Sequence, residues 1–113
     1  MEARILSKSS AIYEWHKYNP SGFKYDNDYI KNLDRTDTKY ITGKKPYFID
    51  LFSMSYAKED RATIFEYACM PGNEDIFKSS AIQKKLQRIC KGIREAYGLK
   101  KVETEFLWEQ YLN

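Results

Sequence analysis

The sequence predicts a single, mainly α-helical domain that spans residues 1–113. Three observations support this: a length that suits one compact domain, apolar residues at helical spacing in several stretches, and an aromatic content of 16% that indicates a folded chain. We expect a small domain of about three helices, a long loop anchored by aromatic side chains, and a short C-terminal element that packs back on the body.

The first helix is predicted from about Ala3 to Tyr18. Apolar residues such as Ile12 and Trp15 recur among polar ones, and Asn19-Pro20 ends the pattern because the residue before a proline disfavours helical backbone. From Pro20 to Pro46 no helical period holds.

That segment is predicted to be a long loop. Its aromatic and apolar residues are expected to anchor it to the body: Phe23, Tyr25, Tyr29, Leu33 and Tyr40. Loops of this length are uncommon in small domains and are typical of functional or covered segments. The loop therefore hints at a partner surface outside the chain.

A second helix is predicted from Lys58 to about Met70, with Pro71-Gly72 ending it. Before it, the short apolar run Tyr47–Phe52 is expected to form a brief strand or a buried turn. Arg61 falls inside the apolar arc of this helix and predicts an acidic partner. That arc is expected to contain Ala62, Ile64, Phe65, Ala68 and Cys69.

The third helix has the clearest amphipathic pattern, with an apolar stripe made of Ile82, Leu86, Ile89, Ile93 and Tyr97. Ser80 with Gln83 predicts a capping box at its start, and Gly98 predicts a left-handed residue after its end. Residues from Thr104 to Leu112 contain enough apolar surface to dock as a short turn or helix.

The basic residues of the third helix are expected on its outer, solvated face: Lys84, Lys85, Arg88, Lys91 and Arg94. Binding of phosphate or of an anionic surface is the alternative for this set. The net charge of the chain is only +3, so we expect no nucleic-acid partner.

The cysteines and the apolar runs of the sequence bear on the cellular compartment of the chain. Cys69 and Cys90 lie on predicted apolar faces, where a free cysteine behaves as a small hydrophobe, and a disulfide between them is left open. No apolar run is long enough for a membrane span, and the first residues do not resemble a signal peptide. The sequence therefore does not indicate in which cellular compartment the protein works.

Three stretches of the chain resemble parts of one family. Phe52–Ala68 resembles the downstream zinc-ligand segment of gluzincin-type metallopeptidases, a group that includes lethal-factor-like bacterial toxins and related lipoproteins. Trp15–Tyr25, which reads W-H-K-Y-N-P-S-G-F-K-Y, is similar to the W-x-x-x-N-P-x-G-F-x-Y stretch between the two ligand elements of those proteins. Leu86–Tyr97 resembles their closing helix.

The resemblance implies roles for residues around the start of the second helix. Glu59 corresponds to the third zinc ligand, and Asp60 to an acid that orients a ligating group. Relatives have a tyrosine seven residues before the ligand glutamate, where its hydroxyl stabilises the tetrahedral intermediate. This chain has Phe52 there, which leaves Tyr56 as the candidate substitute.

The chain lacks the His-Glu-x-x-His motif that supplies two ligands and the base in that family. Its one histidine, His16, has neither a neighbouring glutamate nor a second histidine four residues later. We therefore expect the C-terminal segment, or a degenerate remnant, of a zinc metallopeptidase-like hydrolase, with no catalytic residue of its own and no activity in isolation. Zinc is expected in the parent protein and not in the isolated chain.

The same resemblance implies the partners and the cellular location of the parent protein. The expected partner is the missing N-terminal part of the same protein, the expected substrate is a peptide, and the parent is expected to be secreted or attached to the cell envelope. Two alternatives remain open. Acids such as Glu59 and Asp60 also stabilise a helix simply by complementing its dipole, and the chain could be a non-catalytic helical module that binds another protein.

Overall fold

The computed structural model describes residues 14–28, 40–41, 46–98 and 105–113. Within these ranges the chain forms two α-helices, four 3₁₀ turns and no strand, which confirms the mainly α-helical class. The elements are η2 (Trp15–Tyr18), η3 (Phe52–Met54), α2 (Ala57–Ala68), η4 (Ile76–Lys78), α3 (Ser80–Ala96) and η5 (Leu107–Glu109). Of the predicted first helix, only the end is described, as η2, and residues 3–13 lie outside the described part.

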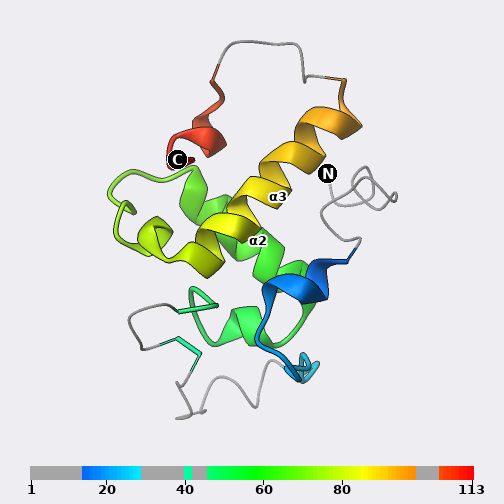
Figure 1. The fold of residues 1–113 in the computed structure, drawn as a ribbon. Helices are drawn as coiled ribbons and strands as arrows, with labels where there is room; N and C mark the ends of the chain where they lie inside the picture. Colours follow the sequence, from blue (N-terminus) through cyan, green and yellow to red (C-terminus); the bar gives the residue numbers. More distant parts are fainter. Residues whose placement is uncertain (1–13, 29–39, 42–45, 99–104) are drawn as a thin grey trace.

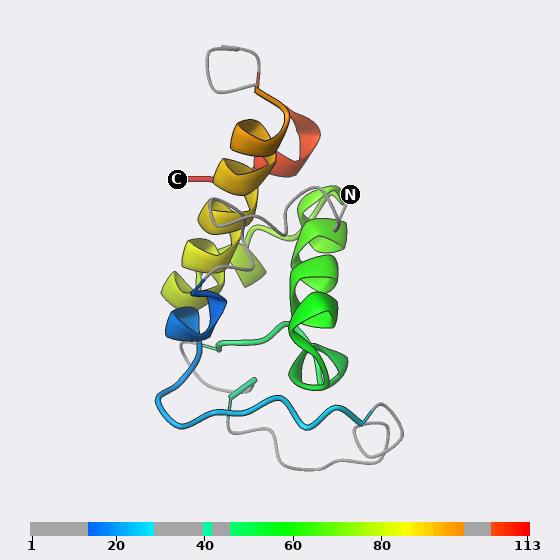
Figure 2. The same cartoon turned by 90° about the vertical axis from the view of Figure 1, so that its right-hand side faces the viewer.

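The two α-helices cross and pack against each other, and the shorter elements pack against one or the other of them (Figures 1 and 2). Turn η3 leads directly into α2, η2 contacts α3, and η5 contacts α2. Burial of each large apolar side chain contributes roughly 1.5–3 kcal/mol. The buried cluster between the elements contains Trp15, Ile64, Ala68, Phe77, Ile82, Leu86, Ile89, Cys90 and Ile93.

The apolar stripe predicted for α3 is largely confirmed. Ile82, Leu86, Ile89 and Ile93 are all buried, whereas Tyr97 is 42% exposed because the helix ends just before it. The following residue, the glycine of the predicted stop, has the expected left-handed backbone with φ of 68°.

The expectation that all the basic residues of α3 lie on a solvated face is wrong. Lys85 is fully buried, and Arg94 is largely covered by the C-terminal segment. The physical reason is helical spacing: Lys85 follows Ile82 by three residues and precedes Ile89 by four, which places it on the apolar stripe.

The start of α3 differs from the prediction by one residue. Ser79, not Ser80, is the N-cap, and its side chain accepts a hydrogen bond from the amide of Ile82. Gln83 does not complete a capping box. Its amide donates instead to the carbonyls of Phe77 and Tyr111, at 2.9 and 3.0 Å, and so joins α3 to two neighbouring segments.

The buried face of α2 also differs from the predicted arc. Ala62 is exposed, because it lies almost opposite Ile64 on the helix, and the fully buried residues Asp60, Ile64 and Ala68 form the inner face at intervals of four. Arg61 is buried as well. Its guanidinium lies 5.6 Å from the centre of the Trp15 ring, a cation–π arrangement.

The long loop is anchored by aromatic packing, as predicted for the residues that the structure describes. Phe23, Tyr25 and Tyr40 surround the buried ring of Phe48, with ring centres 4.7, 6.3 and 6.3 Å from it. The run from Tyr47 to Phe52 forms no strand but an irregular segment that enters η3, in which Phe48 is buried and Phe52 is exposed. Two further predicted anchors, at positions 29 and 33, lie outside the described ranges.

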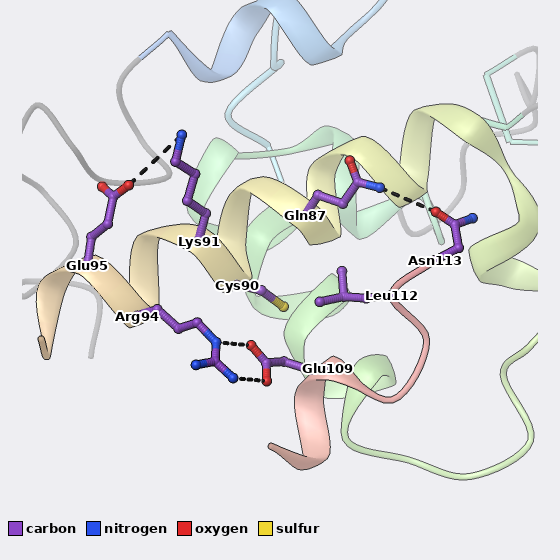
Figure 3. A pocket seen from close by; sticks show the side chains of 8 residues that line it. All are labelled: Gln87, Cys90, Lys91, Arg94, Glu95, Glu109, Leu112 and Asn113. Carbon is purple, nitrogen blue, oxygen red and sulfur yellow. Dashed lines mark hydrogen bonds and ion pairs between the residues drawn. The ribbon is translucent and has the colours of Figure 1, made fainter. Parts of the chain in front are cut away.

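The C-terminal element docks on the helices, as the sequence predicts. Arg94 of α3 forms a forked pair with Glu109 of η5, with nitrogen–oxygen distances of 2.5 and 2.6 Å (Figure 3). Tyr111 stacks on Phe77 at 4.9 Å, and its hydroxyl donates to the carbonyl of Met70.

The two cysteines do not form a disulfide. Cys69 and Cys90 are both free thiols, and burial raises the pKa of Cys90 to about 12, so this thiol is protonated at neutral pH.

In the described segments, no helix combines the length and the apolar character that crossing a membrane requires.

The packing at the centre of α3 predicts a large cost for truncation. Leu86→Ala removes a fully buried side chain and should lower the free energy of unfolding by about 2–5 kcal/mol. Urea unfolding followed by circular dichroism measures it. The matched control is Lys84→Ala on the exposed side of the same turn, which should change stability by less than about 0.5 kcal/mol. Equal effects of the two changes would contradict the assigned faces.

The pair formed by Arg94 and Glu109 predicts a dependence of stability on pH. The hydrogen bonds from Arg94 lower the pKa of Glu109 below the ordinary value of 4.5. Its contribution is therefore complete above that value and is lost as the pH falls through the lower, folded-state pKa. Glu109→Gln should reduce stability at about pH 7, and the difference from the unmodified chain should shrink towards about pH 3. Urea unfolding at both pH values tests this, and a difference that is independent of pH would refute it.

Candidate functional site

The first turn of α2 is fixed by a buried ion pair. Nζ of Lys85 lies 2.8 Å from Oδ2 of Asp60, and both side chains are completely inaccessible to solvent. The same ammonium donates to the carbonyl of Tyr47 at 2.7 Å and lies 3.9 Å from the centre of the Phe48 ring. The lysine thus has a carboxylate, a carbonyl and an aromatic face around its charge, as a buried cation requires.

The hydroxyl of Tyr25 extends this pair into a network. It donates to Oδ2 of Asp60 at 2.7 Å and accepts hydrogen bonds from the indole of Trp15 at 2.9 Å and the side-chain amide of Asn19 at 2.8 Å. We call these five residues the Asp60 network: Trp15, Asn19, Tyr25, Asp60 and Lys85. It joins η2, the long loop and both α-helices at one point.

The protonation behaviour of the network follows from its burial. Burial raises the pKa of Asp60 and lowers that of Lys85, while the opposite charge of each partner counteracts its shift. Burial and the neighbouring carboxylate also raise the pKa of Tyr25, so its hydroxyl keeps its proton and can donate it to Asp60.

Two acceptor atoms of the network remain unused. Oδ1 of Asp60 and Oδ1 of Asn19 are buried, and neither has a hydrogen-bond partner among the residues that the structure describes. An unpaired buried acceptor usually costs about 1–3 kcal/mol. Oδ1 of Asp60 is closed off from solvent, so a hydrogen bond to it from another part of the protein requires that the cover over this atom opens.

Glu59 lies next to this network in the first turn of α2 and is partly exposed. Its amide and that of Asp60 donate to the carbonyl of Tyr56, at 3.1 and 3.0 Å. Buried side chains of the network hold Asp60, and Glu59 is its neighbour in the same helical turn. The network therefore restricts the position of the Glu59 backbone.

The segment before α2 is held by the long loop. Backbone amides of Asp26 and Asn27 donate to the carbonyls of Met54 and Ser55, at 3.2 and 2.7 Å. Tyr56, the candidate hydroxyl donor, donates to the carbonyl of Asn27 at 2.9 Å, and this bond would have to break for the hydroxyl to serve a substrate.

The ring of Phe52, at the position of the expected tyrosine, is 39% exposed. His16 is exposed on η2. Among the described residues, no group of three or more histidine, cysteine, aspartate or glutamate side chains could hold a metal ion. In the first turn of α2, the side chain that could reach a zinc ion is the partly exposed carboxylate of Glu59, because the Asp60 carboxylate is fully buried.

The sequence-based interpretation missed the Asp60 network, although it singled out Asp60 and the stretch from Trp15 to Tyr25. A signal was present: Lys85 lies on the apolar stripe of one predicted helix, and Asp60 precedes Ile64 by four residues on the other. A cation and an anion on the two inner faces predict a buried pair, because neither is stable there alone.

Comparisons with protein-family models, with curated proteins and with solved structures find no match to this chain.

The buried ion pair predicts a strong coupling between its partners. Lys85→Met leaves the Asp60 carboxylate buried without its counter-ion and should lower the free energy of unfolding by about 3–5 kcal/mol. The double variant Lys85→Met, Asp60→Asn should be less destabilised than the sum of the two single changes. Lys84→Met, at the adjacent exposed position, is the control and should be close to neutral. Additive effects in urea unfolding would disprove the coupling.

Proposed function

We propose that this chain is the C-terminal segment of a zinc metallopeptidase-like protein in which Glu59 is the third zinc ligand. The chain is not catalytic by itself, because the two histidine ligands and the general base belong to a preceding part of the protein. A bound zinc ion would lower the pKa of its water ligand and polarise the scissile carbonyl of a peptide.

One observation supports the proposal most: two of the three stretches that resemble the family meet in the Asp60 network, and the third begins directly after its lysine. Trp15, Asn19 and Tyr25 come from the first stretch, Asp60 from the second, and Lys85 lies one residue before the third. Residues far apart in the chain thus cooperate to hold one helical turn. A metal ligand needs this rigidity, because coordination tolerates displacements of only a few tenths of an ångström.

The chemistry of the turn supports the same proposal. Glu59 offers a carboxylate that is partly accessible, while its neighbour Asp60 is locked by Tyr25 and Lys85 on one oxygen only. The second oxygen has no hydrogen-bond partner among the described residues, and a hydrogen bond that a ligating group donated to it would orient that group. Acids that serve only the helix dipole need no such buried anchor.

The proposal is tested on the chain joined to the polypeptide that its gene encodes upstream. An in-frame His-Glu-x-x-His motif is expected there, and the joined protein should bind one zinc ion and cleave peptides. Glu59→Gln should reduce zinc affinity and peptidase activity by more than about 100-fold, since even residues behind the ligands contribute 10–100-fold. Zinc content by mass spectrometry and hydrolysis of a casein-derived peptide mixture are the measurements.

The matched control is Glu66→Gln, which removes an exposed acid from the same helix two turns later and should leave both properties unchanged. An upstream frame without the motif would overturn the proposal and favour an interaction module. So would the isolated chain taking up one zinc ion at submicromolar affinity through Glu59, because a single corner cannot do this.

A further inference from the structure

A groove separate from the α2 turn lies between η2 and α3. Its volume is about 380 Å³, within the range of small-molecule sites. Lys84, Arg88 and Lys91 line one wall from successive turns of α3, at intervals of four and three residues, and Lys17 with Tyr18 lines the other. Its lining is mostly polar, unlike that of a groove that buries an apolar helix.

The charge of the groove is strongly one-sided. Among the described residues, four cations line it with the carboxylate of Glu14, which pairs with Lys17 at 3.3 Å, and Lys91 also lies 4.0 Å from the carboxylate of Glu95 on the same helix. The local excess of positive charge equals the net charge of the whole chain, +3. Elsewhere the charges of the chain balance, so this groove attracts anions more than the net charge suggests.

The dimensions restrict the anion. From Lys84 to Lys91 the helix rises only about 10 Å, which suits one or two phosphoryl groups and not a long polyanion. Arg88 has the planar fork that matches phosphate oxygens, and the lysines beside it are mobile point charges. The half-buried ring of Tyr18 limits the groove on the side of η2.

We propose that this groove binds a compact phosphorylated ligand, with Arg88 as the central contact and Lys17, Lys84 and Lys91 as flanking charges. The phosphoryl group comes from a soluble phosphate ester or from a lipid headgroup, since both present the same chemistry. This site is independent of the zinc proposal, because none of its residues belongs to the Asp60 network.

Inorganic pyrophosphate is the probe, titrated into the isotope-labelled 113-residue chain at constant ionic strength and followed by backbone amide chemical shifts. Saturable shifts are expected in η2 and from residue 84 to residue 91. The double variant Lys84→Gln, Lys91→Gln should weaken the association constant about tenfold, because each exposed ion pair contributes up to about 1 kcal/mol. The control is Lys24→Gln, Lys78→Gln, which removes the same charge from exposed positions elsewhere and should change little.

The sources of phosphate are separated by co-sedimentation with phosphatidylcholine vesicles that contain or lack phosphatidic acid. Sedimentation that requires phosphatidic acid and is lost in the groove variant supports a lipid headgroup, whereas pyrophosphate binding without sedimentation supports a soluble ester. Absence of saturable shifts, shifts spread over all lysines, or equal losses in the groove and control variants would each overturn the proposal.

Discussion

The ion pair between Lys85 and Asp60 is the constraint on which the rest of the structure depends. Both charges lie where the two α-helices meet, and water reaches neither. Such a pair adds little net stability compared with apolar residues of the same size, but it strongly penalises any arrangement that separates the partners. It therefore specifies how α2 and α3 face each other more than it strengthens their contact.

The network around the pair holds the start of the long loop against the two α-helices. Tyr25 reaches Asp60 across 35 positions of the sequence, and Trp15 and Asn19 both donate to the same hydroxyl. Just after this point, the backbone amides of Asp26 and Asn27 donate to the carbonyls of Met54 and Ser55, which precede α2. The side chains of the network thus support the turn that contains Glu59 from the inside, and the backbone of the loop supports the segment just before that turn.

The basic residues of α3 serve three different purposes despite their uniform appearance in the sequence. Lys85 neutralises the buried acid, Arg94 holds η5 through Glu109, and the remaining cations line the groove beside η2. The helical period separates Lys85 from Lys84, Arg88 and Lys91, because positions three or four residues apart share a face and adjacent positions do not. Arg94 differs because the C-terminal segment packs over it. One helix thus connects the interior of the molecule, its C-terminal segment and a charged surface.

Local patterns were sufficient for some features and insufficient for others. The period of α3 predicted its buried stripe, the proline–glycine pair predicted the end of α2, and the apolar C-terminal residues predicted docking. Local patterns failed at Ser80 and Ala62, where a shift of one or two positions moves a side chain to another face of the helix. They also failed at Lys85, because a charge is assigned to solvent unless its partner is known.

By itself, the sequence determined the helical class, the two long helices and the acidic first turn that contains Glu59. Each of these depends on residues within a few positions of one another, and the 3.6-residue period records them directly. Only the tertiary structure decided that Asp60 faces inward to Lys85 and Tyr25 while Glu59 remains partly accessible. That choice depends on contacts between residues 25 and 35 positions apart, which no local pattern encodes.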